Sequence, residues 1–225
     1  MGRLRLDLHV HSQHSPDSLL TLEAITSRLV AVGLNGFALT DHNTVDGHAE
    51  LAKLRAQFPP FVFVPGVEIS AREGHLLVYG VSIPPPSQMP VADTVEWVRD
   101  RGGVCVLAHP FRRAHGVGRA VAERVCVTGI ETVNGHNSPG ANRKAADVAT
   151  RRHLAATGGS DAHQPIDLGR AFTEFPEGTT TVDDVLEAIR KGATTAGGRS
   201  LTLGGRIRYE GRTAWLRLRR GFRPI

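Results

Sequence analysis

The segment LRLDLHVH, residues 4–11, alternates apolar and polar side chains and ends in two histidines that stand one residue apart. A period of two is typical of a β-strand, because successive side chains point to opposite faces of the sheet. His9 and His11 therefore point to the same side of the predicted strand. Two imidazoles on one side at a strand's end are suited to binding a shared metal ion.

Acids and histidines recur at the ends of other predicted strands. We predict strands at residues 4–10, 36–40, 61–69, 75–81, 104–108, 129–133 and 154–158. The polar residues that border them are His9, His11, Asp41, His42, Glu68, His75, His109, Glu131, His136, Asp161 and His163. Among these, His75 alone falls at the start of a strand.

Helical patterns lie between most of these strands, at residues 21–32, 47–55, 91–101, 141–151 and 182–191. Strands that alternate with helices predict an α/β fold with a mainly parallel sheet, and seven strands suit a barrel. In such a barrel the carboxyl ends of the strands meet at one face. We therefore expect the bordering polar residues to converge on one cavity.

These side chains offer imidazole nitrogens and carboxylate oxygens without thiolates, a set that suits zinc, manganese or iron. One ion needs three or four ligands, so about ten candidates predict two or three ions, with Glu68 as a bridge between two of them. Taken singly, a strand histidine is more often a core residue, and the Gly-Ser-Asp run at 159–161 is usually a turn. We favour metal binding because packing alone would bury many ionisable groups together with nothing to offset their desolvation.

Length and composition limit the alternatives. The 225 residues, 40% of them hydrophobic, suit one barrel-sized domain and exclude disorder. The chain has neither an apolar run of roughly 20 residues nor a signal-peptide core, so we expect a cytoplasmic protein that does not bind membranes. Two cysteines, Cys105 and Cys126, are too few for a disulfide framework.

The net charge of +5 is concentrated at the C-terminus. Residues 199–225 hold eight arginines and one acid, so residues 1–198 carry a net charge of −2. We expect residues 1–198 to form the barrel and 199–225 to form a basic segment, a β-hairpin packed on it.

In their order along the chain, these motifs resemble those of the polymerase and histidinol phosphatase (PHP) domain, a family of metal-dependent phosphoesterases. The resemblance covers residues 4–170 and rests on Asp7-Leu-His9-Val-His11, Leu39-Thr-Asp41-His42-Asn43, Gly66-Val-Glu68-Ile-Ser, Gly74-His75-Leu-Leu-Val-Tyr-Gly80, Ala108-His109-Pro110, Gly129-Ile-Glu131 and Gly159-Ser-Asp161-Ala-His163. It implies a distorted (β/α)7 barrel with its metal site at the C-terminal ends of the strands.

The resemblance also implies how the residues share up to three ions. A first ion takes His9, His11, Glu68 and Asp161. Glu68 bridges to a second ion, held with His109 and His136. A third ion takes Asp17, His42 and His163. His75 matches a position that binds metal in some branches of the family and not in others.

Two or three divalent ions would support hydrolysis of a phosphoester by a metal-bridging hydroxide that attacks phosphorus in line. Asp41 is a candidate to protonate the leaving group or orient water, and we favour the alternative that it fixes a histidine tautomer. Arg112 and Arg143 are candidates to pair with the substrate phosphate. The alternative for each arginine is a solvated surface role.

We therefore predict an enzyme, a stand-alone phosphoesterase acting on a small phosphomonoester or nucleotide-type substrate. Histidinol phosphate ranks below these, because the histidinol phosphatases of this family usually have longer chains with larger loops. A hypothesis of another class is a metal-stabilised scaffold whose basic C-terminal segment binds nucleic acid. An intact ligand set favours catalysis over the scaffold.

Overall fold

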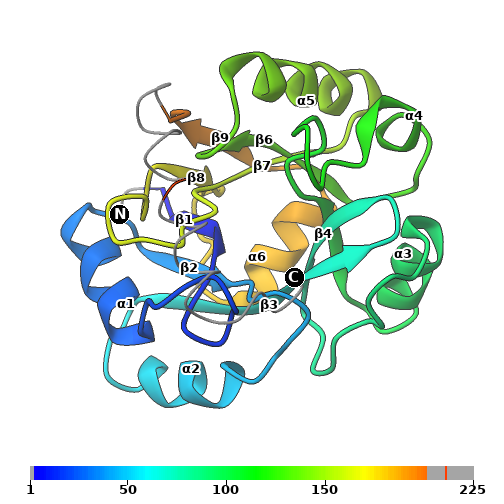
Figure 1. The fold of residues 1–225 in the computed structure, drawn as a ribbon. Coiled ribbons are helices and arrows are strands. Elements are labelled where there is room, and N and C mark those ends of the chain that lie inside the picture. Colours follow the sequence, from blue (N-terminus) through cyan, green and yellow to red (C-terminus); the bar gives the residue numbers. More distant parts are fainter. Residues whose placement is uncertain (1–2, 202–210, 212–225) are drawn as a thin grey trace.

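A nine-stranded sheet curls into a nearly closed barrel with helices around it (Figure 1). The computed structural model describes residues 3–201 and residue 211. The strand order is β7-β6-β5-β4-β3-β2-β1-β8-β9. The α/β barrel expected from the sequence is thus confirmed.

The elements follow the sequence prediction with small shifts at their ends. The strands are β1 (Arg5–Val10), β2 (Gly36–Leu39), β3 (Val62–Ala71), β4 (Gly74–Tyr79), β5 (Val104–Leu107), β6 (Gly129–Asn134), β7 (Ala155–Gly159), β8 (Ala171–Glu174) and β9 (Thr195–Gly198). The helices are α1 (Leu22–Ala31), α2 (His48–Arg55), α3 (Val91–Arg99), α4 (Gly118–Ala122), α5 (Pro139–Arg152) and α6 (Val182–Arg190). The short elements β8, β9 and α4 were not predicted.

Strand β4 departs from the parallel pattern, since it runs antiparallel to both β3 and β5. The reason is the tight connection between β3 and β4, where Ala71 pairs with Gly74 and leaves no room for a crossover helix. The start of β4 consequently lies at the same end of the barrel as the carboxyl ends of its neighbours. This reversal brings His75 to that end although it opens its strand.

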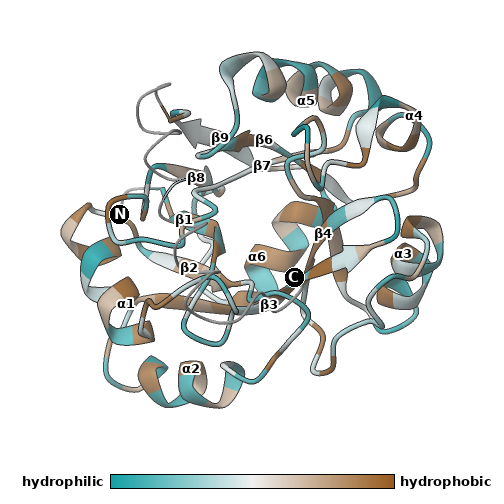
Figure 2. Cartoon of the chain, viewed as in Figure 1, coloured by the Kyte–Doolittle hydropathy of each residue, from teal (hydrophilic) through white to brown (hydrophobic). Residues whose placement is uncertain are grey.

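Apolar side chains fill the barrel, and helix α6 closes the end opposite to the polar residues (Figure 1). Leu186 and Ile189 of α6 pack in one cluster with residues from the starts of the parallel strands, such as Leu6 and Val104, and with Tyr79 from the end of β4. The remaining helices cover the outside of the sheet, α1 and α2 over one part and α3 to α5 over another. Figure 2 shows this division, with hydrophobic strands and helices of mixed hydropathy around them.

The barrel closes where the ends of β1 and β7 meet. Asp161 N donates to His9 O at 2.7 Å, and His11 N donates to Ala162 O at 3.1 Å. The two backbones approach closely because residue 159 is glycine, and a Cβ there would collide with the backbone and Cβ of His9. Backbone hydrogen bonds at the closure therefore join the segment that carries His9 and His11 to the segment that carries Asp161.

None of the helices in residues 3–201 combines the length and apolarity that crossing a membrane requires. The hairpin predicted within residues 199–225 falls almost wholly outside the described residues. The described start of this segment bonds to the barrel, with Arg199 N donating to Arg170 O and Leu201 N donating to Gly135 O at 2.7 Å.

We expect Gly159→Ala to destabilise the protein by about 1–3 kcal/mol, because the added methyl group has no space between β7 and β1. Gly140→Ala is the control, since its Cβ would come no nearer than 3.9 Å to another side chain. Chemical unfolding of both variants measures the difference. Equal stability of the two variants would contradict this account of the closure.

Candidate metal centre

Four side chains place one ligand atom each in a compact group at the carboxyl ends of the strands. The group consists of His9, His11, Glu68 and Asp161, all buried. His9 Nε2 lies 3.1 Å from His11 Nε2, 3.2 Å from Glu68 Oε2 and 3.5 Å from Asp161 Oδ1. His11 Nε2 lies 3.2 Å from Glu68 Oε2 and 3.4 Å from Asp161 Oδ1.

These separations fit a metal ion. A tetrahedral site with bonds of about 2.0–2.1 Å places its ligand atoms about 3.3–3.4 Å apart. Two carboxylates with ligand atoms within 4.8 Å of each other in a buried site also require compensating positive charge. Glu68 Oε2 has no hydrogen-bond partner in the described part of the chain, as expected of an atom reserved for coordination.

The other carboxylate oxygen of Glu68 faces a second pair of histidines. Glu68 Oε1 lies 2.9 Å from His75 Nδ1 and 3.0 Å from His109 Nε2. One carboxylate therefore contacts both pairs, which is the geometry of a bridging ligand. The site thus brings His75, whose role the sequence left open, to the position beside His109.

A third group lies on the other side of the first. Asp17 Oδ2 lies 3.2 Å from His163 Nε2 and 3.7 Å from His42 Nε2. The rings of His42 and His163 both stack on the ring of His11. Ligand atoms of His11, His42 and His163 lie within 4.8 Å of one another. The three residues that the sequence assigned to a third ion therefore meet.

His136, which the sequence predicted as a ligand of the second ion with His109, lies beside Asp167. Its Nε2 is 3.5 Å from Asp167 Oδ2, and neither His136 nor His109 belongs to the compact groups of possible ligands among the described residues. His136 lies in the turn between β6 and α5. The structure places His75 and His109 against the same oxygen of Glu68, and the role of His136 as a ligand stays a prediction.

Hydrogen bonds on the outer side of the rings fix the tautomers that metal binding requires. His9 Nδ1 donates to Glu131 Oε1 at 2.9 Å, and His163 Nδ1 donates to the carbonyl of Asp161 at 2.8 Å. A proton held on Nδ1 leaves the Nε2 lone pair directed at the cluster. Glu131 also accepts the backbone N–H of His109 at 2.8 Å, so it orients a histidine from each of two groups.

Asp41 is buried and holds the loop after β1. It accepts hydrogen bonds from Ser12 N at 2.6 Å, Ser12 Oγ at 2.7 Å and Ser15 Oγ at 2.9 Å. Since Ser15 Oγ donates to Asp41, it accepts from His11 Nδ1 at 3.2 Å. These contacts favour the interpretation that Asp41 fixes a histidine tautomer over the interpretation that it is a proton donor.

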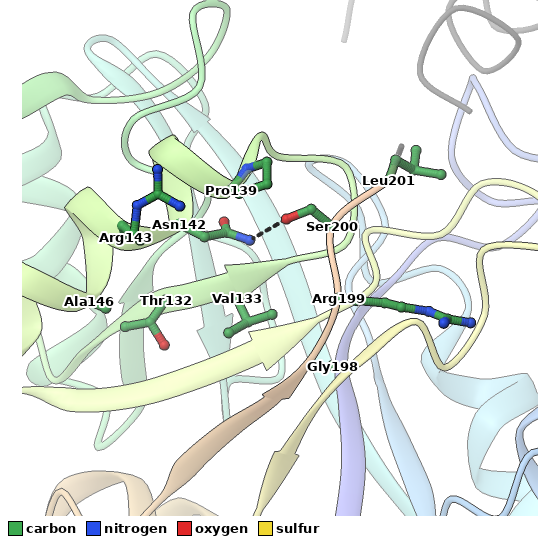
Figure 3. A pocket seen from close by; sticks show the side chains of 10 residues that line it. All are labelled: Thr132, Val133, Pro139, Asn142, Arg143, Ala146, Gly198, Arg199, Ser200 and Leu201. Carbon is green, nitrogen blue, oxygen red and sulfur yellow. Dashed lines mark hydrogen bonds between the residues drawn. The ribbon is translucent and has the colours of Figure 1, made fainter. Parts of the chain in front are cut away.

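The two candidate arginines lie in different surroundings. Arg112, in the loop after β5, donates from Nη2 to Asp161 Oδ2 at 2.5 Å and to Asn134 Oδ1 at 2.7 Å, and its side chain is 27% exposed. Arg143 lies on the exposed face of α5 and lines a separate pocket of about 540 Å³ with Asn142 and Ser200 (Figure 3). The structure thus brings Arg112 to the cluster and places Arg143 on the outer helix.

In the metal-free protein, the clustered charges shift the pKa values of one another's side chains. Burial opposes ionisation of Glu68 and Asp161, yet neighbouring histidines hold the pKa of each carboxyl well below its usual value. Burial likewise opposes protonation of His11, but Asp161 and Glu68 raise its pKa to about 9. A divalent cation would take the place of these protons.

Two of the candidate ligands have strained backbone conformations. His109 and Asp161 adopt φ angles of 29° and 57°, in the left-handed region that side chains other than glycine rarely enter. Such conformations persist where surrounding contacts fix them, often at functional sites. Here they turn both side chains toward the cluster immediately after their strands end.

Comparison with known proteins identifies the family. The model of the PHP domain matches residues 7–80, and that of the PHP-associated region matches residues 139–194. Together the two matches span more than half of the chain. They include every residue of the three ligand groups except His109. The chain belongs to the PHP family.

Among its relatives, the uncharacterized protein MJ1587 of Methanocaldococcus jannaschii is 27% identical over 150 residues, 61% of this chain and 85% of that protein. A 3′,5′-nucleoside bisphosphate phosphatase of Chromobacterium violaceum is 38% identical over 85 residues, 35% of this chain and 29% of that enzyme. The structure of a two-domain Bacteroides vulgatus protein containing a predicted PHP-like metal-dependent phosphoesterase matches with a TM-score of 0.72 and 22% identity. That match covers 88% of this chain and 65% of the solved chain, less than two thirds of its length, and it shows the shared fold.

The PHP family and the His/Glu/Asp cluster together indicate divalent metal binding. The sequence assigned no role to Asp7, which stands on the same side of β1 as His9 and His11. Its carboxylate accepts Ser160 N at 2.8 Å and Gly169 N at 3.1 Å, and burial raises its pKa to about 6. Asp7 thereby anchors the loop that carries Asp161. In the sequence, its spacing of two residues from His9 was the feature that could have identified it as part of the site.

We expect at least two divalent ions per chain after expression in metal-replete medium, and fewer in Asp161→Ala with the fold retained. Asp147→Ala, an exposed acid on α5, is the control and should keep the full content. Removal of the ions should lower the melting temperature, since a ligand at 100 times its Kd stabilises by about 2.7 kcal/mol. Elemental analysis that finds less than one ion per wild-type chain would contradict the site.

Metal binding should also release protons. At pH 7.5 the metal-free protein keeps His11 protonated, because its pKa is about 9, whereas a bound ion requires the neutral imidazole. Protonated His11 stabilises the folded, metal-free protein below pH 6.5, and this stabilisation is lost as the pH rises to about 9. The affinity for metal rises over the same pH range, because the ion binds the neutral imidazole. Calorimetric titration in two buffers of different ionisation enthalpy measures the release, and identical heats in both buffers would exclude it.

Proposed function

We propose that this PHP protein is a metal-dependent phosphoesterase that hydrolyses a small phosphomonoester or a nucleotide-type substrate. The observation that carries the proposal is the position of Glu68, whose two oxygens face different sets of histidines. In this position Glu68 would serve as a ligand to two ions. Paired ions are suited to in-line displacement at phosphorus.

The residues present would hold ions in the three groups described above. When bound, divalent ions lower the pKa of water and neutralise the phosphoryl oxygens. The protein's own contribution is to fix the ligand rings, through Glu131 behind His9 and through Asp41 and Ser15 behind His11. Asp41 serves as a positioning residue, because all three of its hydrogen bonds go to the loop after β1.

Arg112 is the residue best placed to bind the substrate phosphate. Its guanidinium is held against the first group by Asp161 and Asn134, and its side chain is partly exposed there. A planar guanidinium held in place loses little freedom when it pairs with a phosphoryl oxygen. Arg112 would therefore orient the phosphoester over the first group.

The relative named as a nucleoside bisphosphate phosphatase supports a nucleotide-type substrate, over the 85 residues that it shares with this chain. Histidinol phosphate stays the second choice. The decisive experiment is to remove all metal, reload zinc, manganese or iron separately, and measure phosphate release from nucleoside mono- and bisphosphates, histidinol phosphate and a phosphodiester. Asp161→Ala is the inactive control.

Turnover of at least one phosphoester that depends on the added metal and on Asp161 would support the proposal. Folded, metal-loaded protein that hydrolyses none of them would overturn it. Salt-sensitive retention on nucleic acid without turnover would instead favour the scaffold hypothesis.

We expect Arg112→Ala to lower kcat/KM by roughly 10- to 150-fold on the best substrate, through loss of a charge-assisted contact. The sequence predicted the same for Arg143, but its place on α5 makes Arg143→Ala the matched control, with a change of less than about two-fold. Metal content is measured together with the kinetics. Unchanged metal content would assign the loss to phosphate binding, whereas reduced content would assign it to the contact that holds Asp161. Equal losses in both variants would contradict the assignment of phosphate binding to Arg112 rather than Arg143.

A further inference from the structure

A second cluster of polar side chains lies beside the metal centre, on the loop between β7 and β8. We name Gln164, Asp167 and Arg170 of this loop the 164–170 subsite, and we include in it His136, which lies between β6 and α5 and contacts Asp167. Asp167 Oδ2 is 3.5 Å from His136 Nε2, and Asp167 Oδ1 is 3.9 Å from Arg170 Nε. None of these residues belongs to the three ligand groups among the described residues.

Several polar atoms of this subsite are buried without a hydrogen-bond partner in the described structure. They are Asp167 Oδ2, Gln164 Nε2 and Arg170 Nε. Asp167 is 2% exposed and Gln164 is 8% exposed. Buried polar groups left unpaired destabilise a protein, so three in one place indicate a ligand that completes them.

The subsite is built rigidly and adjoins the metal centre. Asp167 N donates to Gln164 O and Arg170 N donates to Asp167 O, both at 3.1 Å. Gln164 directly follows His163, and the ring of His136 stands edge-on to that of His163 at 6.4 Å.

The chemistry of the unpaired atoms selects the ligand. Asp167 offers an acceptor, whereas Gln164 and Arg170 offer N–H donors. A phosphate would be repelled by Asp167, and a metal ion by Arg170. A hydroxyl group both donates and accepts, so adjacent hydroxyls of a sugar or polyol satisfy the set.

We propose that the 164–170 subsite binds hydroxyl groups on the leaving group, so that the preferred substrates are phosphoesters of sugars or polyols. This inference rests on the proposed function and names its substrate class. Asp167 and Gln164 act in it as specificity-determining residues. The ions and Arg112 hold the phosphoryl group, and the subsite selects what is attached to it.

The test compares ribose 5-phosphate with tetrahydrofurfuryl phosphate, which has the same ring without hydroxyls. We expect wild-type holoenzyme to favour ribose 5-phosphate by about 10-fold or more in kcat/KM, because an unmatched polar subsite rejects the analogue. Gln164→Met and Asp167→Asn should each reduce that ratio at least about five-fold. Gln57→Met, the same change at an exposed residue after α2, is the control and should leave the ratio unchanged.

A wild-type ratio near one, or a ratio that both variants leave within about two-fold of wild type, would overturn the inference. If neither compound is hydrolysed, the proposed function fails on that pair. The same ratio is then read from the dissociation constants of the two compounds by calorimetry on wild type and variants. Hydroxyl discrimination that Gln164→Met and Asp167→Asn abolish would sustain the subsite without turnover, and its absence would end the proposal.

Discussion

The buried carboxylate of Glu68 is the contact on which the rest of the site depends. Its two oxygens lie within 2.9–3.2 Å of five imidazoles, those of His9, His11, His42, His75 and His109. These rings come from β1, β4 and the turns after β2 and β5, so most of the barrel must be in place before the cluster exists. A carboxylate in this position is stable only with compensating positive charge, from protons in the metal-free protein or from divalent ions.

A layer of hydrogen bonds behind the histidines makes this arrangement specific. Glu131 accepts a hydrogen bond from the ring of His9, while Asp41 and Asp7 accept from Ser15 and Ser160, which contact or adjoin candidate ligands. None of the three is near the surface, and each satisfies several donors. The strain at His109 and Asp161 is tolerated because these contacts and the closure between β1 and β7 fix the turns in which they lie.

The same barrel end holds two chemically different regions. One is rich in histidine and carboxylate and is suited to cations, whereas the loop from Gln164 to Arg170 presents a mixed set of donors and an acceptor. His136 lies between them, next to Asp167. A division of this kind is what a phosphoesterase needs, because the phosphoryl group and the leaving group differ in charge and in hydrogen bonding.

The sequence by itself determined the strands, the helices and the polar residues at the strand ends, because periodicity and position relative to a strand are local properties. It therefore predicted the barrel and the first and third ligand groups. Tertiary structure alone decided the direction of β4, which brings His75 to Glu68 beside His109, and the place of Arg143 in a pocket on α5. These outcomes depend on how one strand pairs with its neighbours and where a loop turns, which are non-local contacts that spacing along the chain does not encode.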